Sequence, residues 1–134
     1  MTLIKILIVD DEKDILTILK SALEVHGGFL VKCVTSGEEA LKEAPIFQPD
    51  LILLDILMPV MDGMATFKAL QSIPSVAQVP VVIITAFADP EKVKTLLKSG
   101  IVDVIVKPFD PWTLPGKIQS ILDRYQREKR NLGK

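Results

Sequence analysis

The sequence predicts an α/β fold, a doubly wound five-stranded parallel sheet with helices on both faces. Five short runs rich in Val, Ile and Leu alternate with stretches whose apolar residues recur at helical spacing. The runs are nearly continuous, which is typical of strands buried on both faces of a parallel sheet. Right-handed crossovers then wind the chain in both directions. The 134 residues, 49% hydrophobic and 25% charged, suit one domain with its own core.

The five apolar runs give the expected strands. Gly, Pro, Asp or Lys marks at least one end of each run, which is typical of strand boundaries. We expect strands at residues 3–9, 29–34, 50–55, 80–85 and 102–106.

The first two helices are expected to be short and amphipathic. The first should end at the Gly27-Gly28 pair, because glycine adopts the backbone conformation that stops a helix. Ser36 should cap the second helix, and Pro45 should close it at about Ala44. The inward face of the first helix should carry Ile15, Ile18, Leu19, Ala22 and Leu23.

The last three helices carry clearer start signals. The third should start at Asp62 or Gly63, and Asp89 should cap the fourth. Because Pro115 removes a backbone donor, the fifth should begin near residue 113 or 114. The basic tail from residue 124 is expected to fray, and we divide the chain into a domain of residues 1–126 and a tail of 127–134. The fourth helix should turn Val93, Leu96 and Leu97 inward.

Polar residues mark the carboxyl ends of four expected strands. Asp10 and Asp11 follow the first, Asp55 ends the third, Thr85 ends the fourth and Lys107 follows the fifth. The carboxyl ends of parallel strands share one edge of the sheet, where ligands bind, so we expect a single site. Three close carboxylates call for a cation, and Mg²⁺ prefers oxygen ligands. A carboxylate can also act as a nucleophile and form an acyl phosphate, whose oxygens a lysine and a hydroxyl can stabilise.

The segments around these residues resemble the receiver domain of two-component response regulators. The match extends from about Leu3 to about Tyr125, and its order and spacing are specific when taken together. The resemblance implies a flavodoxin-like sheet with strand order 2-1-3-4-5. The matching segments are Ile8-Val9-Asp10-Asp11-Glu12, Leu53-Leu54-Asp55-Ile56-Leu57-Met58-Pro59, Met61-Asp62-Gly63, Thr85-Ala86 and Lys107-Pro108-Phe109.

The resemblance also implies how the site works. Asp55 would be the phosphoacceptor, and Thr85 and Lys107 would sense the phosphoryl group. The Lys107–Pro108 bond would be cis and would aim the lysine inward. The donor would be a phosphohistidine on a sensor histidine kinase or a phosphotransfer protein, in the manner of bacterial-type phosphorelay signal transduction.

The same resemblance implies a Mg²⁺ site. Asp11 would be a direct ligand, Asp10 would act mostly through water, and Asp55 would complete the set of carboxylates. Leu57 would offer its backbone carbonyl.

Two departures from the family pattern are visible. Val104 stands three residues before the lysine, where many receivers carry an aromatic residue that reports phosphorylation. Leu57 and Phe87 are apolar at the positions that flank the path of hydrolytic water in the family. We therefore expect slow loss of the phosphoryl group and a switch that lacks the aromatic reporter.

Several readings compete with a phosphorylation-controlled switch that catalyses only its own phosphorylation and slow dephosphorylation. A haloacid-dehalogenase-like phosphatase would need a second Asp two residues after the nucleophile, where Leu57 stands. A receiver-like scaffold that is never phosphorylated is disfavoured because all five expected site residues are present. The chain can be a stand-alone protein or a regulatory domain excised from a larger regulator, and the sequence leaves both open.

Composition narrows the partners and the compartment. The net charge of −1 gives no global attraction to nucleic acid or membrane, and no apolar run is long enough to cross a bilayer. Nothing after Tyr125 is long enough for a helix-turn-helix, so we expect no nucleic-acid binding through this domain. One cysteine, Cys33, fits a reducing cytoplasm.

Ile101, Val104 and Trp112 suggest an apolar patch around helix 4, strand 5 and helix 5. This patch is either a homodimer face or ordinary exposed surface.

Overall fold

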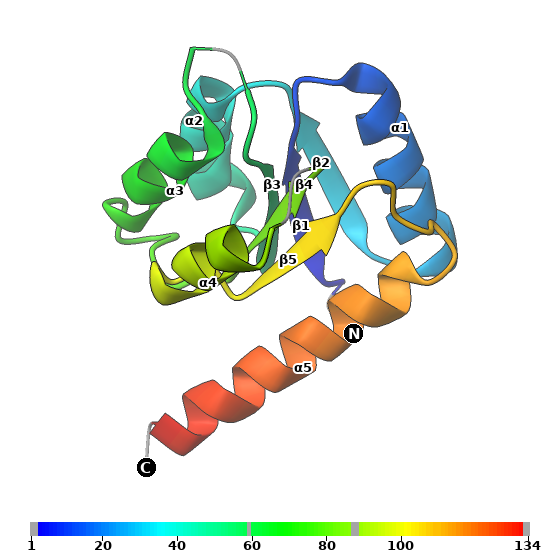
Figure 1. The fold of residues 1–134 in the computed structure, drawn as a ribbon. Helices are drawn as coiled ribbons and strands as arrows, with labels where there is room; N and C mark the ends of the chain where they lie inside the picture. The colour runs from blue at the N-terminus through cyan, green and yellow to red at the C-terminus, as the bar shows by residue number, and fades with distance from the viewer. Residues whose placement is uncertain (1–2, 59, 87–88, 133–134) are drawn as a thin grey trace.

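The computed structural model describes residues 3–58, 60–86 and 89–132. They form a five-stranded sheet in the order β2-β1-β3-β4-β5, and every neighbouring pair is parallel (Figure 1). This confirms the predicted fold class and strand order. The strands are β1 (Lys5–Val9), β2 (Leu30–Val34), β3 (Leu51–Asp55), β4 (Val81–Thr85) and β5 (Asp103–Val106).

Two layers of helices cover the sheet (Figure 1). Helices α1 (Lys13–Ser21) and α5 (Leu114–Leu132) pack on one face, and a π-helical segment, η1 (Ala22–His26), extends α1. Helices α2 (Gly37–Phe47), α3 (Gly63–Gln71) and α4 (Pro90–Lys98) cover the other face. Within the ranges described, no helix combines the length and the apolar character needed to cross a membrane.

The strand bodies supply the core. In β3, Leu53 packs toward α1 and α5, whereas Leu54 packs toward α2, α3 and α4, and both side chains are fully buried. Successive strand residues point to opposite faces, so a run without polar residues serves both layers at once. The central strands are therefore held firmly along their length, which fixes the position of the residues at their ends.

The inward face of α1 differs from the one we predicted. Leu16, absent from that prediction, is buried together with Leu19 and Leu23, whereas Ile18 is 45% exposed. Leu16, Leu19 and Leu23 recur at intervals of three and four and form one stripe. The apolar arc of this helix is wider than the strip that the sheet covers, and Ile18 lies outside that strip. The prediction that Leu97 of α4 faces inward is also wrong. Leu97 is 44% exposed, because it too lies at the edge of an apolar arc wider than the strip that the sheet covers.

Two helix ends also differ from expectation. Helix α2 continues through Pro45 to Phe47, and Gln48 ends it with a left-handed backbone (φ 54°). Pro45 removes one backbone donor, but the Gln48 amide still donates to the Ala44 carbonyl at 2.9 Å and closes the last turn. Helix α5 begins at Leu114 as predicted but extends to Leu132, so the segment after residue 124 is helical.

The apolar patch that we considered around β5 does not form from the three residues named for it. Ile101 and Val104 are buried, and Trp112 is exposed within the loop that precedes α5. The Trp112 ring lies 4.4 Å from the ring of His26, centroid to centroid. The exposed apolar residues on the α4 and β5 side are instead Leu97 and Val106.

Candidate functional site

Buried polar residues occur at the ends of the three central strands. Asp10 directly follows β1, Asp55 is the last residue of β3, and Thr85 is the last residue of β4. All three are buried, with relative exposures of 0%, 4% and 1%. Polar side chains in such positions are rare unless they are paired or functional. The carboxyl edge of the sheet is therefore the candidate site.

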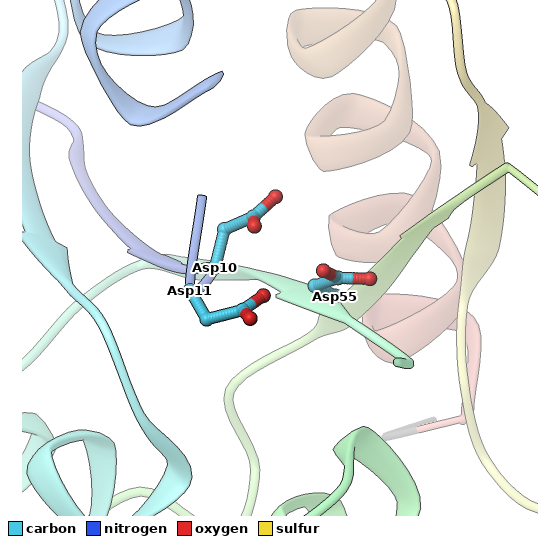
Figure 2. A group of neighbouring side chains, drawn as sticks. All are labelled: Asp10, Asp11 and Asp55. Atoms are coloured by element: carbon cyan, nitrogen blue, oxygen red, sulfur yellow. The ribbon is translucent and has the colours of Figure 1, made fainter. Parts of the chain in front are cut away.

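Three carboxylates gather at this edge. Figure 2 shows Asp10 and Asp11, which follow β1, beside Asp55 at the end of β3. One oxygen from each lies within 4.8 Å of the others. Asp11 is exposed, whereas Asp10 and Asp55 are buried. The structure therefore brings together the three acidic residues predicted from the sequence.

Lys107 faces this acidic group from the loop after β5. Its Nζ lies 3.0 Å from Asp10 Oδ2, 3.3 Å from Glu12 Oε1 and 3.7 Å from Asp55 Oδ2. Glu12 is a site residue that the sequence did not predict. Its place in the Ile8–Glu12 segment was a weak signal for it, but residue spacing does not show how far a side chain reaches across the edge of a sheet.

Short hydrogen bonds fix the backbone around the site. The Glu12 amide donates to Asp10 Oδ1 at 2.9 Å, and the Leu57 amide donates to Asp55 Oδ1 at 3.1 Å. The Lys107 amide donates to the Thr85 carbonyl at 2.8 Å, which joins the ends of β4 and β5. The Lys107–Pro108 peptide bond is cis, as predicted.

The environment of Asp55 favours its neutral form. Burial and then the charge of Asp10 raise the pKa of Asp55 to about 6, against the lowering effects of the Leu57 amide and Lys107. Desolvation and a like charge both disfavour a carboxylate anion. One lysine therefore does not compensate the acidic group fully.

The environment of Lys107 favours its charged form. Burial alone would lower its pKa, but the hydrogen bond and the charge of Asp10, followed by Asp55, outweigh burial and raise the pKa of Lys107. The lysine therefore stays cationic at neutral pH. It is the positive charge that faces the carboxylates.

The donor set fits a hard divalent cation. Asp10, Asp11 and Asp55 offer only carboxylate oxygens, and their spacing lets one small ion contact several of them. Mg²⁺ takes oxygen ligands and keeps several waters, and the exposed Asp11 leaves room for water. The residues present therefore fit the metal.

The structure describes two of the three positions at which the sequence departs from the family pattern. Leu57 lies two residues beyond Asp55 and is largely exposed, and Val104 is buried in β5. Phe87, the third, lies outside the described residues.

Comparison with known proteins identifies the family. Residues 6–119 match the response regulator receiver domain family, and this chain belongs to it. The matched span includes strands β2 to β5, all of β1 except Lys5, and every site residue described above.

Curated relatives are longer than this chain. A probable transcriptional regulator, ycf27, from Cyanidium caldarium is 39% identical over 127 residues, which cover 95% of this chain and 49% of the relative. The alkaline phosphatase synthesis transcriptional regulatory protein PhoP of Bacillus subtilis is 40% identical over 121 residues, covering 90% of this chain and 49% of PhoP. The chain thus spans about half the length of these relatives.

A solved structure shares the fold closely. The chemotaxis protein CheY4 of Vibrio cholerae superposes with a TM-score of 0.83 at 32% identity, over 90% of this chain and 99% of that one.

Proposed function

We propose that Asp55 accepts a phosphoryl group in a Mg²⁺-dependent reaction and that the domain thereby acts as a signalling switch. The donor is a phosphohistidine on a sensor histidine kinase or a phosphotransfer protein. One observation carries the proposal: the carboxylates of Asp10, Asp11 and Asp55 meet Lys107 at a single strand edge. Membership of the receiver domain family supports it.

The residues divide the chemistry among them. A carboxylate oxygen of Asp55 attacks phosphorus, the P–N bond of the phosphohistidine breaks, and its electron pair stays on the imidazole nitrogen, which takes a proton from solvent. Lys107 neutralises phosphoryl oxygens, and the hydroxyl of Thr85 donates to another. Asp11, Asp55 and the Leu57 carbonyl would hold Mg²⁺, with Asp10 acting mostly through water, and the ion would offset the charge of the transferring group.

Phosphorylation then changes which partner the domain binds. The exposed Leu97 and Val106 support a homodimer through the α4, β5 and α5 face. Because Val104 replaces an aromatic residue, Thr85 and Lys107 carry the switch without an aromatic reporter. Apolar Leu57 beside the site supports slow self-dephosphorylation.

The boundaries of the domain and its place in a larger protein are also part of the proposal. We assign residues 1–126 to the receiver domain and 127–134 to a basic segment that leads toward an output domain in a larger regulator. The curated relatives, which carry transcriptional-regulator names and twice the matched length, support this arrangement. Nucleic-acid binding then lies outside this domain, and the compartment is the cytoplasm. A dehalogenase-like phosphatase is not favoured, because Leu57 lacks the carboxyl group that this chemistry needs.

Acetyl phosphate provides the direct test. With Mg²⁺, intact-mass measurement should detect one added phosphoryl group on the wild-type protein. Asp55→Asn should abolish the adduct, whereas Asp50→Asn, at the exposed opposite end of β3, should keep it. Chelating the metal should prevent it.

The outcomes separate the rival functions. A wild-type protein that gains no Asp55-dependent mass would refute the phosphoacceptor proposal. Sustained hydrolysis of a small phosphate ester would favour the phosphatase. Light scattering on the phosphorylated protein measures self-association, and the decay of the adduct measures the rate of dephosphorylation.

A further inference from the structure

Two helices of this molecule begin in the same way. Helix α2 begins at Gly37 after Ser36, whose hydroxyl accepts from the amide three residues later at 3.1 Å. Helix α3 begins at Gly63 after Asp62, whose carboxylate accepts from the amide three residues later at 2.8 Å. Both glycines are buried. The two helix starts therefore form a matched pair within one chain.

The space beside Gly63 is filled by the backbone of the phosphoacceptor strand. A Cβ atom at this position would overlap the carbonyl oxygen of Asp55 and lie 2.6 Å from the Cα of Ile56. The Gly63 amide donates to the Ile56 carbonyl at 3.0 Å, so the two segments are also bonded. Backbone atoms in a buried strand end cannot rotate away as a side chain can. A side chain at position 63 must therefore displace the Asp55–Ile56 peptide.

The space beside Gly37 is filled by side chains instead. A Cβ atom there would overlap the hydroxyl of Thr66 and lie 3.1 Å from Cγ and Sδ of Met61. Substitution of Gly37 therefore strains the contact between α2 and α3 without touching the backbone of β3.

The Asp55–Ile56 peptide matters because the nucleophile projects from it. The Asp55 carboxylate accepts from the Leu57 amide at 3.1 Å and lies 3.7 Å from Lys107 Nζ. A shift of the peptide would change both distances. Phosphoryl transfer depends mainly on positioning, and a displacement of about 1 Å can cost on the order of a hundredfold in rate.

We propose that Gly63 is a positioning residue for phosphoryl transfer, because its missing side chain lets the first turn of α3 rest directly on the Asp55–Ile56 peptide. This inference rests on the proposed phosphoacceptor function and deepens it.

The test compares Gly63→Ala with Gly37→Ala in the full chain. With acetyl phosphate and Mg²⁺, Gly63→Ala should lower the maximal phosphorylation rate to about a tenth or less of wild type, with the half-saturating donor concentration nearly unchanged. Gly37→Ala should keep the maximal rate within about twofold. Both variants should unfold at lower temperature than wild type, so stability alone cannot explain a difference in rate. Calorimetric titration with Mg²⁺ gives a second readout, and only Gly63→Ala should bind the ion more weakly.

Each result decides the matter. Equal maximal rates in the two folded glycine variants, whether high or low, would overturn the positioning role. If the wild-type protein gains no phosphoryl group, the proposed function fails first. If Gly63→Ala does not fold, Asp62→Ala, which removes the cap of α3, is compared with Asp62→Asn, which keeps a capping oxygen without the charge. A lower rate in Asp62→Ala alone supports the role, and equal rates in both overturn it.

Discussion

Strand β5 carries an ion pair at each end, and the two pairs differ in burial and in charge balance. At the amino end, Arg124 Nη2 lies 3.2 Å from Asp103 Oδ2, and both side chains are substantially exposed. At the carboxyl end, Lys107 lies 3.0 Å from Asp10 and 3.7 Å from Asp55, and all three side chains are largely or fully buried. The first pair is neutral and screened by water, whereas the second is desolvated and has an excess of negative charge.

The difference shows that the residues at the carboxyl ends of the strands destabilise the folded state. The apolar bodies of the central strands stabilise the sheet, while their last residues bring like charges together in a poorly solvated place. Such an arrangement destabilises the metal-free protein and favours the binding of a cation. Substitutions at the two ends of β5 should therefore differ in size, in sign and in their dependence on Mg²⁺.

The largest effect is expected from Lys107→Met. The substitution keeps the apolar stem of the side chain but leaves Asp10 and Asp55 facing each other without a cation. Breaking a buried charge pair by removing one partner is strongly destabilising, so we expect a loss of about 2–3 kcal/mol in the free energy of unfolding near neutral pH without divalent ions. Urea unfolding measures it.

Magnesium is the control for this prediction. A bound ion stabilises the folded state, so saturating Mg²⁺ should recover part of the loss. If Lys107→Met unfolded at the wild-type urea concentration, the excess of negative charge at this edge would not be what limits stability.

Much of this edge could be predicted from the sequence. Asp10, Asp55 and Thr85 follow apolar runs that read as buried strands, and the shared edge of a parallel sheet then brings them together. The fold class and strand order needed no more than the alternation of elements and the family resemblance. These signals are local or topological, so a single sequence carries them.

Other features depend on tertiary packing and gave no such signal. Glu12 reaches Lys107 only because of how β1 and β5 are placed across the sheet. Ile18 has the same helical spacing as its buried neighbours, and only the width of the covered strip excludes it. Trp112 meets His26 because a π-helical segment ends beside the loop before α5, which no local pattern predicts.

An effect of opposite sign is expected from Asp55→Asn. Because the pKa of Asp55 is raised to about 6 in the folded state, above its value of 3.8 in an unfolded chain, the folded state binds more protons between these values. The ionised carboxylate therefore lowers stability as pH rises through this window. Removing it should raise the free energy of unfolding by about 1–2 kcal/mol near neutral pH, less than the full pKa shift implies, because solvent at the edge of the site, where Asp11 is exposed, screens part of the charge.

The pH profile distinguishes this cause from improved packing. The gain from Asp55→Asn should be complete above about pH 6 and absent below about pH 4, where both states of the wild-type carboxyl are protonated. Chemical unfolding of both proteins across this range measures the difference. A gain that persisted unchanged into acid would point to a cause other than ionisation. With Mg²⁺ present the advantage should shrink, because the wild-type carboxylate then has a cation to bind.

The smallest effect is expected at the opposite end of β5. Arg124→Gln removes the pair with Asp103 and a hydrogen bond from Arg124 to the Val102 carbonyl, so a double-mutant cycle with Asp103→Asn is needed to isolate the ion pair. Exposed pairs contribute about 0.2–1 kcal/mol, and we expect a coupling energy in that range that falls with added salt. Mg²⁺ should not change it, since neither side chain belongs to the acidic group. A coupling energy as large as the Lys107→Met effect would contradict the contrast in strength between the exposed and the buried ion pair. A coupling energy that responded to Mg²⁺ would mean that the two ends of β5 interact electrostatically, so that the stability cost of the carboxyl edge is not confined to the site.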